Sequence, residues 1–582
     1  MFERRQNLIA EKFWQYLLPT ILMTMSTSIA MVVDGIIVGN LLGARELAAL
    51  NLTMPLTLCF SALFAMVGVG GSTLMSMARA ERDEKRVAAF VSLSTALLAG
   101  GGVLFSVLGT ILLPEITRAL SSEAELNALV SAYAWVLLLG APVQILVPGL
   151  TFFIRSDGAP AFASKVLIVA NIVNLSMDVV YMRFMGMGIE GAGLATVTGY
   201  SVGAVMVGVY LLRPGHGLSF VLPRKAICSR TAEILATGAT SALGQIFLFL
   251  KILALNHIVL MTLGTAGMVA FSVCISCLSL VSMFISGATQ TMMPIVGAMY
   301  GEKDWKGIRF TLNRALSFVA WSSLLLILVF ELIPQWIMAC YGVHDPEEVA
   351  IGVQALRLFA PSLLGVGFSF VVMYYFQAVK QSRLSIATSV VQGLFVVPCA
   401  YLLSKVWGGT GIWLSFIISE LATAAFIASM ARVKRAKNPG RYSSVFLFPI
   451  PEDAKFMDVT LFSNSRDAAR ISEQVADFAG GQGLEAPKAM MVGLAAEEMA
   501  MLITRHSYEG KPNRPIDVMV HLDPKDVILR FRDGGRTFNP TTCPEDEDGA
   551  CSNIFLLRRL AQKIDYTRVI GLNSTIVTMA RA

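Results

Sequence analysis

Charged residues are scarce in this sequence. Asp, Glu, Lys and Arg make up 15% of the 582 residues, where soluble domains carry about 25%, and the mean hydropathy is +0.65. Glycine and proline are plentiful but follow no period, which excludes collagen-like and disordered classes. The eight cysteines are scattered, so they supply neither a disulfide framework nor a zinc motif. These absences leave a polytopic membrane protein as the expected class.

The formal net charge of +6 does not indicate a nucleic-acid partner. The Lys and Arg residues lie in short loops between apolar runs rather than in one basic patch. The beginning of the sequence, MFERRQNLIAEKFWQYLL, is basic, but its apolar run has spanning length and lacks a small-residue cleavage site. We therefore expect a first membrane helix here rather than a signal peptide, and a lipid bilayer as the surroundings.

Twelve apolar runs are long enough to cross a bilayer, which takes about 20 residues. They lie at residues 14–40, 47–77, 87–113, 126–153, 161–184, 190–212, 234–262, 266–298, 308–337, 350–377, 384–405 and 410–431. The expected fold is therefore an all-α membrane protein with twelve transmembrane helices.

Loop charges predict the orientation of these spans. The loops after even-numbered spans are basic: Arg79, Arg82, Lys85, Arg86, Arg155, Lys165, Arg213, Arg224, Lys225, Arg230, Lys303, Lys306, Arg309, Lys380 and Arg383. The loops after odd-numbered spans hold little beyond Arg45, Arg118, Arg183 and Lys405. Because cytoplasmic loops carry the excess of Lys and Arg, we expect a cytoplasmic (inner) membrane protein with both termini in the cytoplasm.

The two sets of six spans resemble each other. GVGGSTLMSMARAERDEKRV leaves span two much as SGATQTMMPIVGAMYGEKDWKGIR leaves span eight. Residues 1–222 and 223–435 are therefore expected to be two six-helix halves with the same topology, related by an axis along the membrane normal. The expected mechanism is alternating access, in which a central cavity between such halves opens first to one side of the membrane and then to the other.

Two spans carry a carboxylate near their middle, Asp34 and Asp178. An acid at bilayer depth is costly, so it usually marks an ion or substrate path. Asn171, Asn174 and Asp178 share one helix face, and Thr196 can add a hydroxyl from the next span. Amide and carboxylate oxygens suit a small cation or a shared proton, while Asn171 or Asn174 can instead join helices.

The membrane part resembles the multidrug and toxic compound extrusion (MATE) transporters over residues 10–435. The resemblance rests on MVVDGIIVGNLLGARELAALNLTMPL and on RSDGAPAFASKVLIVANIVNLSMDVVYMRFMGMGIEGAGLATVTGY. It implies antiport of small organic compounds, cationic or amphiphilic, against H⁺ or Na⁺. It also implies a cation site, holding Na⁺ if that is the coupling ion, at Asp34, Asn174, Asp178 and Thr196.

The second half is chemically different, with Lys251 in its first span and Glu420 in its last. Two interpretations of Lys251 stay open: contact with an acid or an anionic substrate in the cavity, and snorkelling to the membrane surface. Asn171 is also expected to contact a substrate in the cavity. Two alternative functions stay open for the chain: a lipid or polymer flippase, and a membrane-anchored signalling protein.

After Arg435 the composition becomes polar. Residues 436–455 are expected to be a linker, and residues 456–582 a cytosolic α+β domain in which helices cover one face of a mixed sheet. Its expected strands are MDVTLF, IDVMVHL, DVILRFRD, IDYTRV and STIVTM, and its expected helices SRDAARISEQVADFAG, APKAMMVGLAAEEMAMLITRH and NIFLLRRLAQ.

This domain resembles the GHKL ATP-binding fold and, within it, the serine-kinase anti-sigma factors. RDGGRTFNP resembles the adenine-binding box, which implies ATP or ADP contacts at Asp533 and Gly535, with Gly549 and Asn573 from the lid and final strands. Glu498 matches the proposed general base, which would act as the catalytic residue of a kinase. However, Leu502 replaces the family's magnesium-binding Asn, and Cys551-Ser552-Asn553 replaces the glycine-rich lid. Kinase activity, nucleotide sensing and binding of a cytosolic protein partner all stay open.

Overall fold

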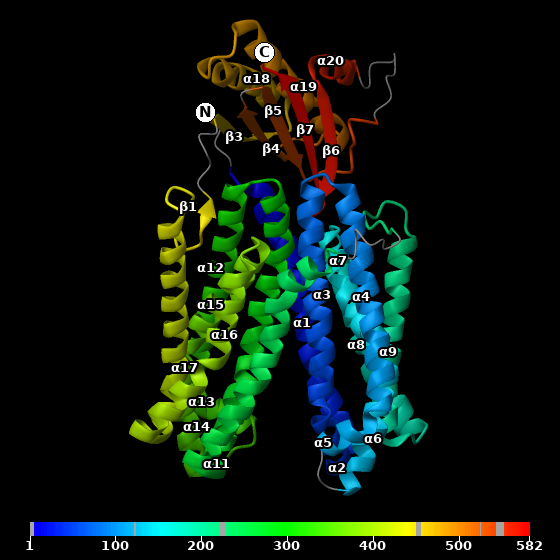
Figure 1. The fold of residues 1–582 in the computed structure, drawn as a ribbon, viewed down its shortest axis with the longest axis vertical. Helices are drawn as coiled ribbons and strands as arrows, with labels where there is room; N and C mark the ends of the chain where they lie inside the picture. Colours follow the sequence, from blue (N-terminus) through cyan, green and yellow to red (C-terminus); the bar gives the residue numbers. More distant parts are fainter. Residues whose placement is uncertain are drawn as a thin grey trace.

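The computed structural model describes residues 5–120, 124–221, 229–449, 455–523, 525–542 and 552–581. A bundle of long helices forms one end of the molecule, and a smaller domain built on a β-sheet forms the other (Figure 1). We call the latter, residues 455–581, the tail domain. This division confirms the expected all-α membrane part joined to an α+β domain.

The helices fall into two halves. The first half contains α1 (Asn7–Leu41), α2 (Ala44–Leu52), α3 (Met54–Ala80), α4 (Glu84–Ile111), α5 (Leu113–Leu120), α6 (Ala124–Leu139), α7 (Ala141–Ser156), α8 (Pro160–Val179), the π-helical turn η1 (Val180–Phe184) and α9 (Gly188–Leu212). The second half contains α11 (Thr231–Gly301), α12 (Trp305–Leu332), α13 (Pro334–Cys340), α14 (Pro346–Phe359), α15 (Ser362–Ala378), α16 (Ser382–Leu394) and α17 (Val396–Lys437).

Eight helices are long and apolar enough to cross a membrane, or ten when each of two bent pairs counts as one span, among the described residues. Two of these contain a glycine with a left-handed backbone, Gly264 (φ 64°) in α11 and Gly408 (φ 57°) in α17. At 1.5 Å per residue, α11 would be about 107 Å long if straight, over three times the ~30 Å hydrocarbon layer. Each break therefore separates two membrane passes. Counting both breaks raises the number of spans in the described residues from ten to the expected twelve.

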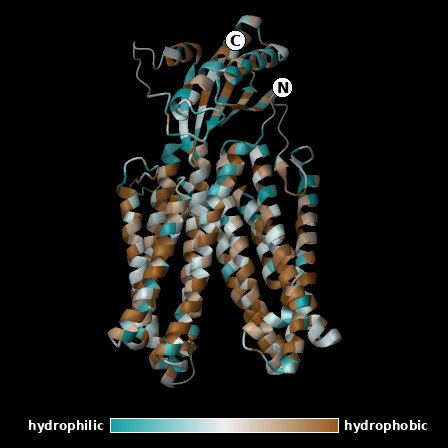
Figure 2. Ribbon diagram, turned by 180° about the vertical axis from the view of Figure 1, so that it is seen from behind, coloured by the Kyte–Doolittle hydropathy of each residue, from teal (hydrophilic) through white to brown (hydrophobic). Residues whose placement is uncertain are grey.

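The surface of the bundle is apolar where lipid would surround it. Large side chains such as Ile111, Leu212 and Trp321 are exposed, and apolar residues run along most of the helix length (Figure 2). Hydrophilic residues gather in the tail domain and at the helix ends. In lipid such a surface needs no cover, because the surrounding hydrocarbon is itself apolar.

The internal repeat is visible in matching turns. Arg82, after α3, and Lys303, after α11, both adopt the left-handed conformation (φ 61° and 57°). The next residue then caps the following helix: Asp83 accepts from the Arg86 amide at 3.0 Å, and Asp304 from the Gly307 amide at 2.8 Å. The same local signal thus produces the same turn in both halves.

The two halves meet most closely where α3 crosses α11. A Cβ on Gly70 would lie 2.3 Å from the Ile234 carbonyl oxygen, and one on Gly238 would lie 1.7 Å from that of Met66. Only glycine permits this approach. The ribbons of the two halves come together toward the tail domain and diverge at the far end (Figures 1 and 2).

The tail domain has a five-stranded sheet in the order β3-β4-β5-β7-β6. Its strands are β3 (Lys455–Phe462), β4 (Pro515–Leu522), β5 (Asp526–Asp533), β6 (Lys563–Val569) and β7 (Leu572–Ala580), and its helices are α18 (Ser465–Gly481), α19 (Ala486–Leu502), the π-helical turn η2 (Ile503–Ser507) and α20 (Ser552–Leu560). Every pair of neighbours is antiparallel. The expectation of a mixed sheet is therefore wrong. Short turns join β4 to β5 and β6 to β7 as antiparallel hairpins, and the longer connections with the helices add β4 and β6 in the antiparallel sense as well.

The expected linker holds an ordered two-stranded ribbon. Within 436–449, α17 continues to Lys437, and β1 (Tyr442–Ser443) then pairs with β2 (Phe448–Pro449). The hydroxyl of Tyr375 on α15 donates to the Phe446 carbonyl at 3.0 Å. The ribbon is thus attached to the membrane bundle, and residues 450–454 lie outside the described residues.

Gly238 provides a test of the contact between the halves. We expect Gly238→Ala to destabilise the protein by about 1–3 kcal/mol, because the added methyl group overlaps the α3 backbone. Gly244→Ala, on the same helix with nothing within 4 Å of a Cβ, is the matched control. Thermal unfolding in detergent measures both, and equal unfolding temperatures for the two variants would contradict the close crossing.

Candidate functional site

A polar stripe runs along α8. Asn171, Asn174 and Asp178 follow one another at helical spacing, and Asp178 is fully buried. The π-helical turn η1 begins two residues after Asp178. Such wide turns recur at functional sites because they change the direction of side chains within a helix.

Asp34 on α1 faces Asp178 across the contact between the two helices. The carboxyl groups lie within hydrogen-bonding reach of each other, a separation at which two ionised carboxylates repel each other. Oδ1 of Asp34 and both Oδ atoms of Asp178 accept no hydrogen bond from a donor in the described part of the chain. Buried oxygen atoms without a donor are costly, so this pair is suited to take up a cation.

Asn174 and Thr196 lie beside the pair and are bonded to each other. The Asn174 amide donates to the Thr196 hydroxyl at 3.2 Å, and Thr196 bonds the Ala192 carbonyl at 3.3 Å. Gly199 brings α9 close to α8, since a Cβ there would lie 2.4 Å from the Ala170 carbonyl oxygen. Because Asn174 donates through its nitrogen, its oxygen is left to accept or to coordinate.

Tyr133 on α6 is a residue that the sequence did not indicate. Its ring is buried, and its hydroxyl interacts electrostatically with both Asp34 and Asp178. A lone tyrosine in an apolar run carries no spacing signal, so only the packing of α6 reveals this neighbour.

Asn171 points to a different set of partners. Its amide lies 3.3 Å from the hydroxyls of Ser26 and Thr27 on α1. It therefore joins α8 to α1, about two helical turns from each acid.

The second half holds a separate buried polar cluster. The Glu420 carboxylate on α17 accepts from Ser369 at 2.7 Å and from Gln392 at 3.0 Å. Lys251 on α11 interacts electrostatically with Glu420 and is partly exposed. Both expected roles of Lys251, contact with an acid or anionic substrate and snorkelling to the membrane surface, stay predictions.

The expected nucleotide residues of the tail domain come together in part. Asp533 at the end of β5 accepts from Asn573 and from the Gly535 amide, both at 2.9 Å, and from Ser507. Burial raises the pKa of Asp533 above its ordinary value, although these hydrogen bonds oppose the shift. The carboxylate that would contact adenine is therefore present and fixed.

The phosphate side of this site fits a nucleotide less well. Glu498 lies on α19, and Leu502, one turn further, is buried. A leucine cannot ligate Mg²⁺, and among the described residues no group of three or more His, Cys, Asp or Glu could hold a metal. Gly549 lies outside the described residues, as does Cys551.

The tail domain rests on the membrane bundle through the open face of its sheet. Arg532 on β5 forms buried ion pairs with Glu302 and with Asp304, the latter at 2.9 Å. Ser574 on β7 donates to Glu302 at 2.8 Å and receives Arg82 on its carbonyl oxygen at 3.2 Å. Ser574 thus contacts the turn after α3 in the first half and the turn after α11 in the second half.

Electrostatics keep this contact ionised. Burial raises the pKa of Glu302. The opposite effect is larger: the pKa is lowered by the guanidinium groups of Arg532 and Arg530 and by the hydrogen bond from Ser574. The resulting pKa lies below the ordinary value of 4.5. At neutral pH the Glu302 carboxylate is charged and paired.

Comparison with known proteins identifies two families along the chain. The MatE family model matches residues 19–180 and 240–402, more than half of the chain, and the histidine kinase-like ATPase domain model matches residues 462–581. The multidrug export protein MepA of Staphylococcus saprophyticus is 25% identical over 66% of this chain and 85% of its own length. MepA of Staphylococcus aureus is 24% identical over 69% and 89%.

Solved structures share the fold of the membrane part. An outward-facing MATE transporter of the MOP superfamily has a TM-score of 0.68 at 20% identity, covering 73% of this chain and 96% of its own. A MOP superfamily transporter from Pyrococcus furiosus, described as having a binding pocket of reversed polarity, has a TM-score of 0.68 at 21% identity over 74% and 97%. The chain therefore belongs to the MatE family of multi-pass membrane transporters and carries a histidine kinase-like ATPase domain after its membrane helices.

Proposed function

We propose that this protein is a secondary antiporter that exports organic cations or amphiphiles in exchange for H⁺ or Na⁺. The observation that carries the proposal is the facing of Asp34 and Asp178 in an apolar bundle, with buried oxygen atoms that lack donors in the described protein. The printed names of the relatives, which export multiple drugs, support an organic substrate.

The chemistry of the pair follows from charge. Two adjacent carboxylates in a medium of low dielectric repel each other, so they bind one proton or a small cation between them. Na⁺ would be held by oxygens of Asp34, Asp178, Asn174 and Thr196, a donor set of the hard kind that such ions prefer. An organic cation competes for the same negative charge, and this competition couples the two fluxes.

Alternating access supplies the direction of transport. The ribbons of the halves come together near the tail domain and diverge at the far end (Figure 1), and in this proposal the halves rock about their contact near the tail domain. We place the tail side in the cytoplasm because the basic loops with Arg82 and Lys306 lie there and contact the tail domain. Rocking of the halves then opens the tail side to load substrate.

The tail domain is proposed to regulate this rocking. It contacts the first half through Arg82 and the second through Glu302 and Asp304. Because the tail domain is attached to both halves, the tail side opens only when at least one of these contacts breaks. A docked tail domain therefore slows loading of substrate from the cytoplasm.

Lys251 favours a second candidate function, transport of an amphiphile with an anionic headgroup. It is a partly exposed cation in a membrane helix, and the Glu420 oxygens already accept from Ser369 and Gln392. Its ammonium group therefore keeps donors for an anionic ligand.

Coupling is tested with Asp178→Asn in reconstituted vesicles. We expect efflux of a fluorescent organic cation to follow an imposed H⁺ or Na⁺ gradient in the wild-type protein. In the variant, efflux should fall to the rate of protein-free vesicles, because the neutral amide no longer exchanges a charge. Glu190→Gln, which removes an exposed acid outside the pair, should leave efflux unchanged.

Two outcomes would overturn this proposal. Gradient-driven efflux that persists in Asp178→Asn would place the coupling elsewhere. Absence of wild-type efflux under both gradients, together with movement of a labelled anionic lipid that Lys251→Met abolishes, would establish the flippase instead.

Docking of the tail domain is tested with Arg532→Glu. Breaking a buried ion pair costs about 3–5 kcal/mol, so the variant should release the tail domain and accelerate efflux. Hydrogen exchange at residues 302–307 reports the release directly. The exposed Arg514→Glu serves as a control of equal charge change, and the swap Glu302→Arg with Arg532→Glu should restore part of the protection.

The same contact predicts a pH dependence. Since the pKa of Glu302 is lowered from 4.5, its contribution to docking is complete above pH 4.5 and is lost as the pH falls through the lowered value. Protection of residues 302–307 from hydrogen exchange should therefore be constant near neutrality and decrease only in acid.

Release of the tail domain without any change in efflux would disprove regulation while leaving antiport intact.

The tail domain is not expected to transfer phosphate, because Leu502 offers no ligand to Mg²⁺. We expect the full-length protein with ATP and Mg²⁺ to show the same ADP production as its Glu498→Gln variant. Turnover that depends on Glu498 would establish a kinase or ATPase and reject the regulatory proposal for this domain.

A further inference from the structure

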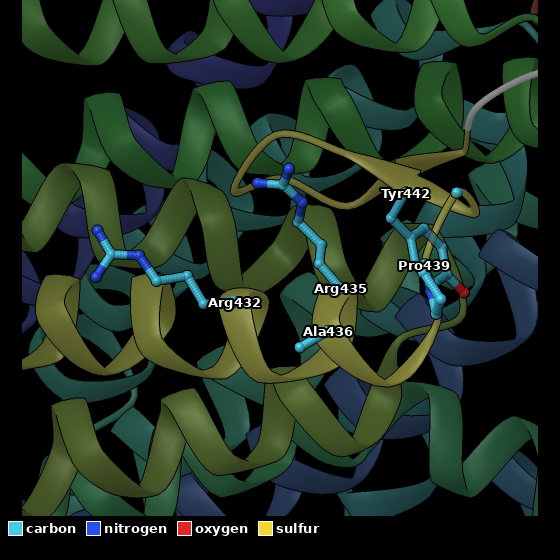
Figure 3. A pocket seen from close by; sticks show the side chains of 6 residues that line it. Arg432, Arg435, Ala436, Pro439 and Tyr442 are labelled. Carbon is cyan, nitrogen blue, oxygen red and sulfur yellow. The ribbon is translucent and has the colours of Figure 1, made fainter.

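A hollow at the tail-side end of α17 is lined by basic residues. Arg432, Arg435 and Ala436 from the helix, with Pro439, Gly440 and Tyr442 from the segment that follows, enclose about 350 Å³ (Figure 3). The helix end and the ribbon form two walls, and the side chain of Arg435 extends toward the ribbon. The transport site described above uses none of these residues.

The ribbon makes the wall opposite the helix rigid. Tyr442 pairs with Pro449 across the ribbon. The rings of Phe446 and Phe448 pack on each other and on Tyr375 of α15, with centroids 5.9 to 6.4 Å apart. Together with the hydrogen bond from Tyr375 to Phe446, these contacts fix Tyr442 relative to the membrane helices.

Within the described ranges, no acidic side chain pairs with the guanidinium groups at the hollow. Arg432 and Arg435 are exposed and lie one turn apart on α17, and among the described residues no ion pair includes either of them. Lys434, in contrast, bonds to Gln381 and lies 5.9 Å from the Tyr442 ring centre, and Arg441 lies 5.6 Å from the same centre.

Favourable interaction with the helix dipole explains why cations occur in the last turn of α17. It does not explain a hollow between them, closed on one side by an aromatic ring. Ala436 lies one residue after Arg435 and is too small to fill the space. Arg435 extends toward the ribbon and Arg432 away from it (Figure 3). Because both side chains are exposed and lie one turn apart, they can turn toward one multiply charged oxyanion, for which the forked donors of arginine are well suited.

The position of the hollow identifies the source of that oxyanion. α17 is the last membrane-crossing helix, and its exposed apolar side chains Leu421, Met430 and Val433 lead toward the basic end. Acyl chains can lie against such residues while a headgroup reaches the arginines. Clusters of Lys and Arg directly cytoplasmic of a membrane helix attract anionic lipids in this manner.

We propose that this hollow binds the phosphate headgroup of an anionic phospholipid of the membrane. Arg432 and Arg435 hold the phosphate oxygens, and Tyr442 contacts the glycerol part at the membrane surface. The site does not depend on the transported substrate or on the coupling ion. Because α17 leads through the ribbon to the tail domain, a bound lipid also fixes the place where the chain leaves the membrane.

The test compares lipids retained by the purified protein. We would measure binding of dioctanoyl phosphatidylglycerol and of dioctanoyl phosphatidylcholine by native mass spectrometry and by titration in detergent. The wild-type protein should prefer the anionic lipid, and Arg432→Gln with Arg435→Gln should weaken that binding about thirtyfold, at about tenfold per 1.4 kcal/mol. A higher NaCl concentration should also weaken binding of the anionic lipid to the wild-type protein, because salt screens the charges.

Two further variants separate charge from shape. Arg383→Gln with Lys437→Gln removes two exposed cations of the same half outside the hollow, and it should retain the preference. Ala436→Trp keeps every charge but fills the hollow, and it should lose the preference, which keeps the test valid if the arginine variant folds poorly.

Three results would overturn the proposal. One is an unchanged lipid preference in the arginine variant or in Ala436→Trp, and another is an equal loss in the control. The third is inorganic phosphate that competes as strongly as the lipid does, because that would show a site for free anions.

Discussion

Two carboxyl groups that face each other inside an apolar bundle constrain this structure more than any other contact. Asp34 and Asp178 come from α1 and α8, and oxygen atoms of both accept no hydrogen bond in the described protein. The surrounding geometry supports that meeting: Gly199 lets α9 approach α8, Asn171 joins α8 to α1, and the π-helical turn follows Asp178. The proposed binding of a proton or a cation follows from the cost of placing two acids in such a site.

The internal repeat gives a second use to the turns at the tail side. The same sequence signal places Arg82–Asp83 after α3 and Lys303–Asp304 after α11, each with a left-handed residue followed by a cap. The tail domain contacts both turns through neighbouring strands. A duplicated structural feature thereby provides two docking points, one on each half. The proposed regulation needs no contact with the substrate path, because a tail domain that holds both turns would restrain both halves.

Much of this architecture was predictable from local patterns. Apolar runs of spanning length located the passes, and β5 has the predicted bounds because its alternation is regular. Pairing was less predictable: the sheet is antiparallel throughout, and the segment near Tyr442 is a ribbon rather than a plain linker. Strand order depends on contacts between distant residues, which leave no periodic signal in the sequence.

The candidate site shows the same limit. Spacing on α8 placed Asn171, Asn174 and Asp178 on one face, and the structure shows that Asn171 joins α1 while Asn174 bonds to Thr196. Tyr133 and the contact of Arg532 with Glu302 and Asp304 were not foreseen. Glu302 and Asp304 lie more than 200 residues before Arg532 in the sequence. Each of these three residues alone is typical of a solvated surface.

The central claim is that substrate and coupling ion compete for one pair of carboxyl groups. Linkage then requires that binding of one releases the other, in equal measure in both directions. The most direct measurement is the number of protons or Na⁺ ions released when purified protein binds an organic cation near neutral pH, compared with Asp34→Asn. The account predicts release of about one ion per substrate in the wild-type protein and none in the variant. Substrate binding that releases no ion from the wild-type protein would contradict it.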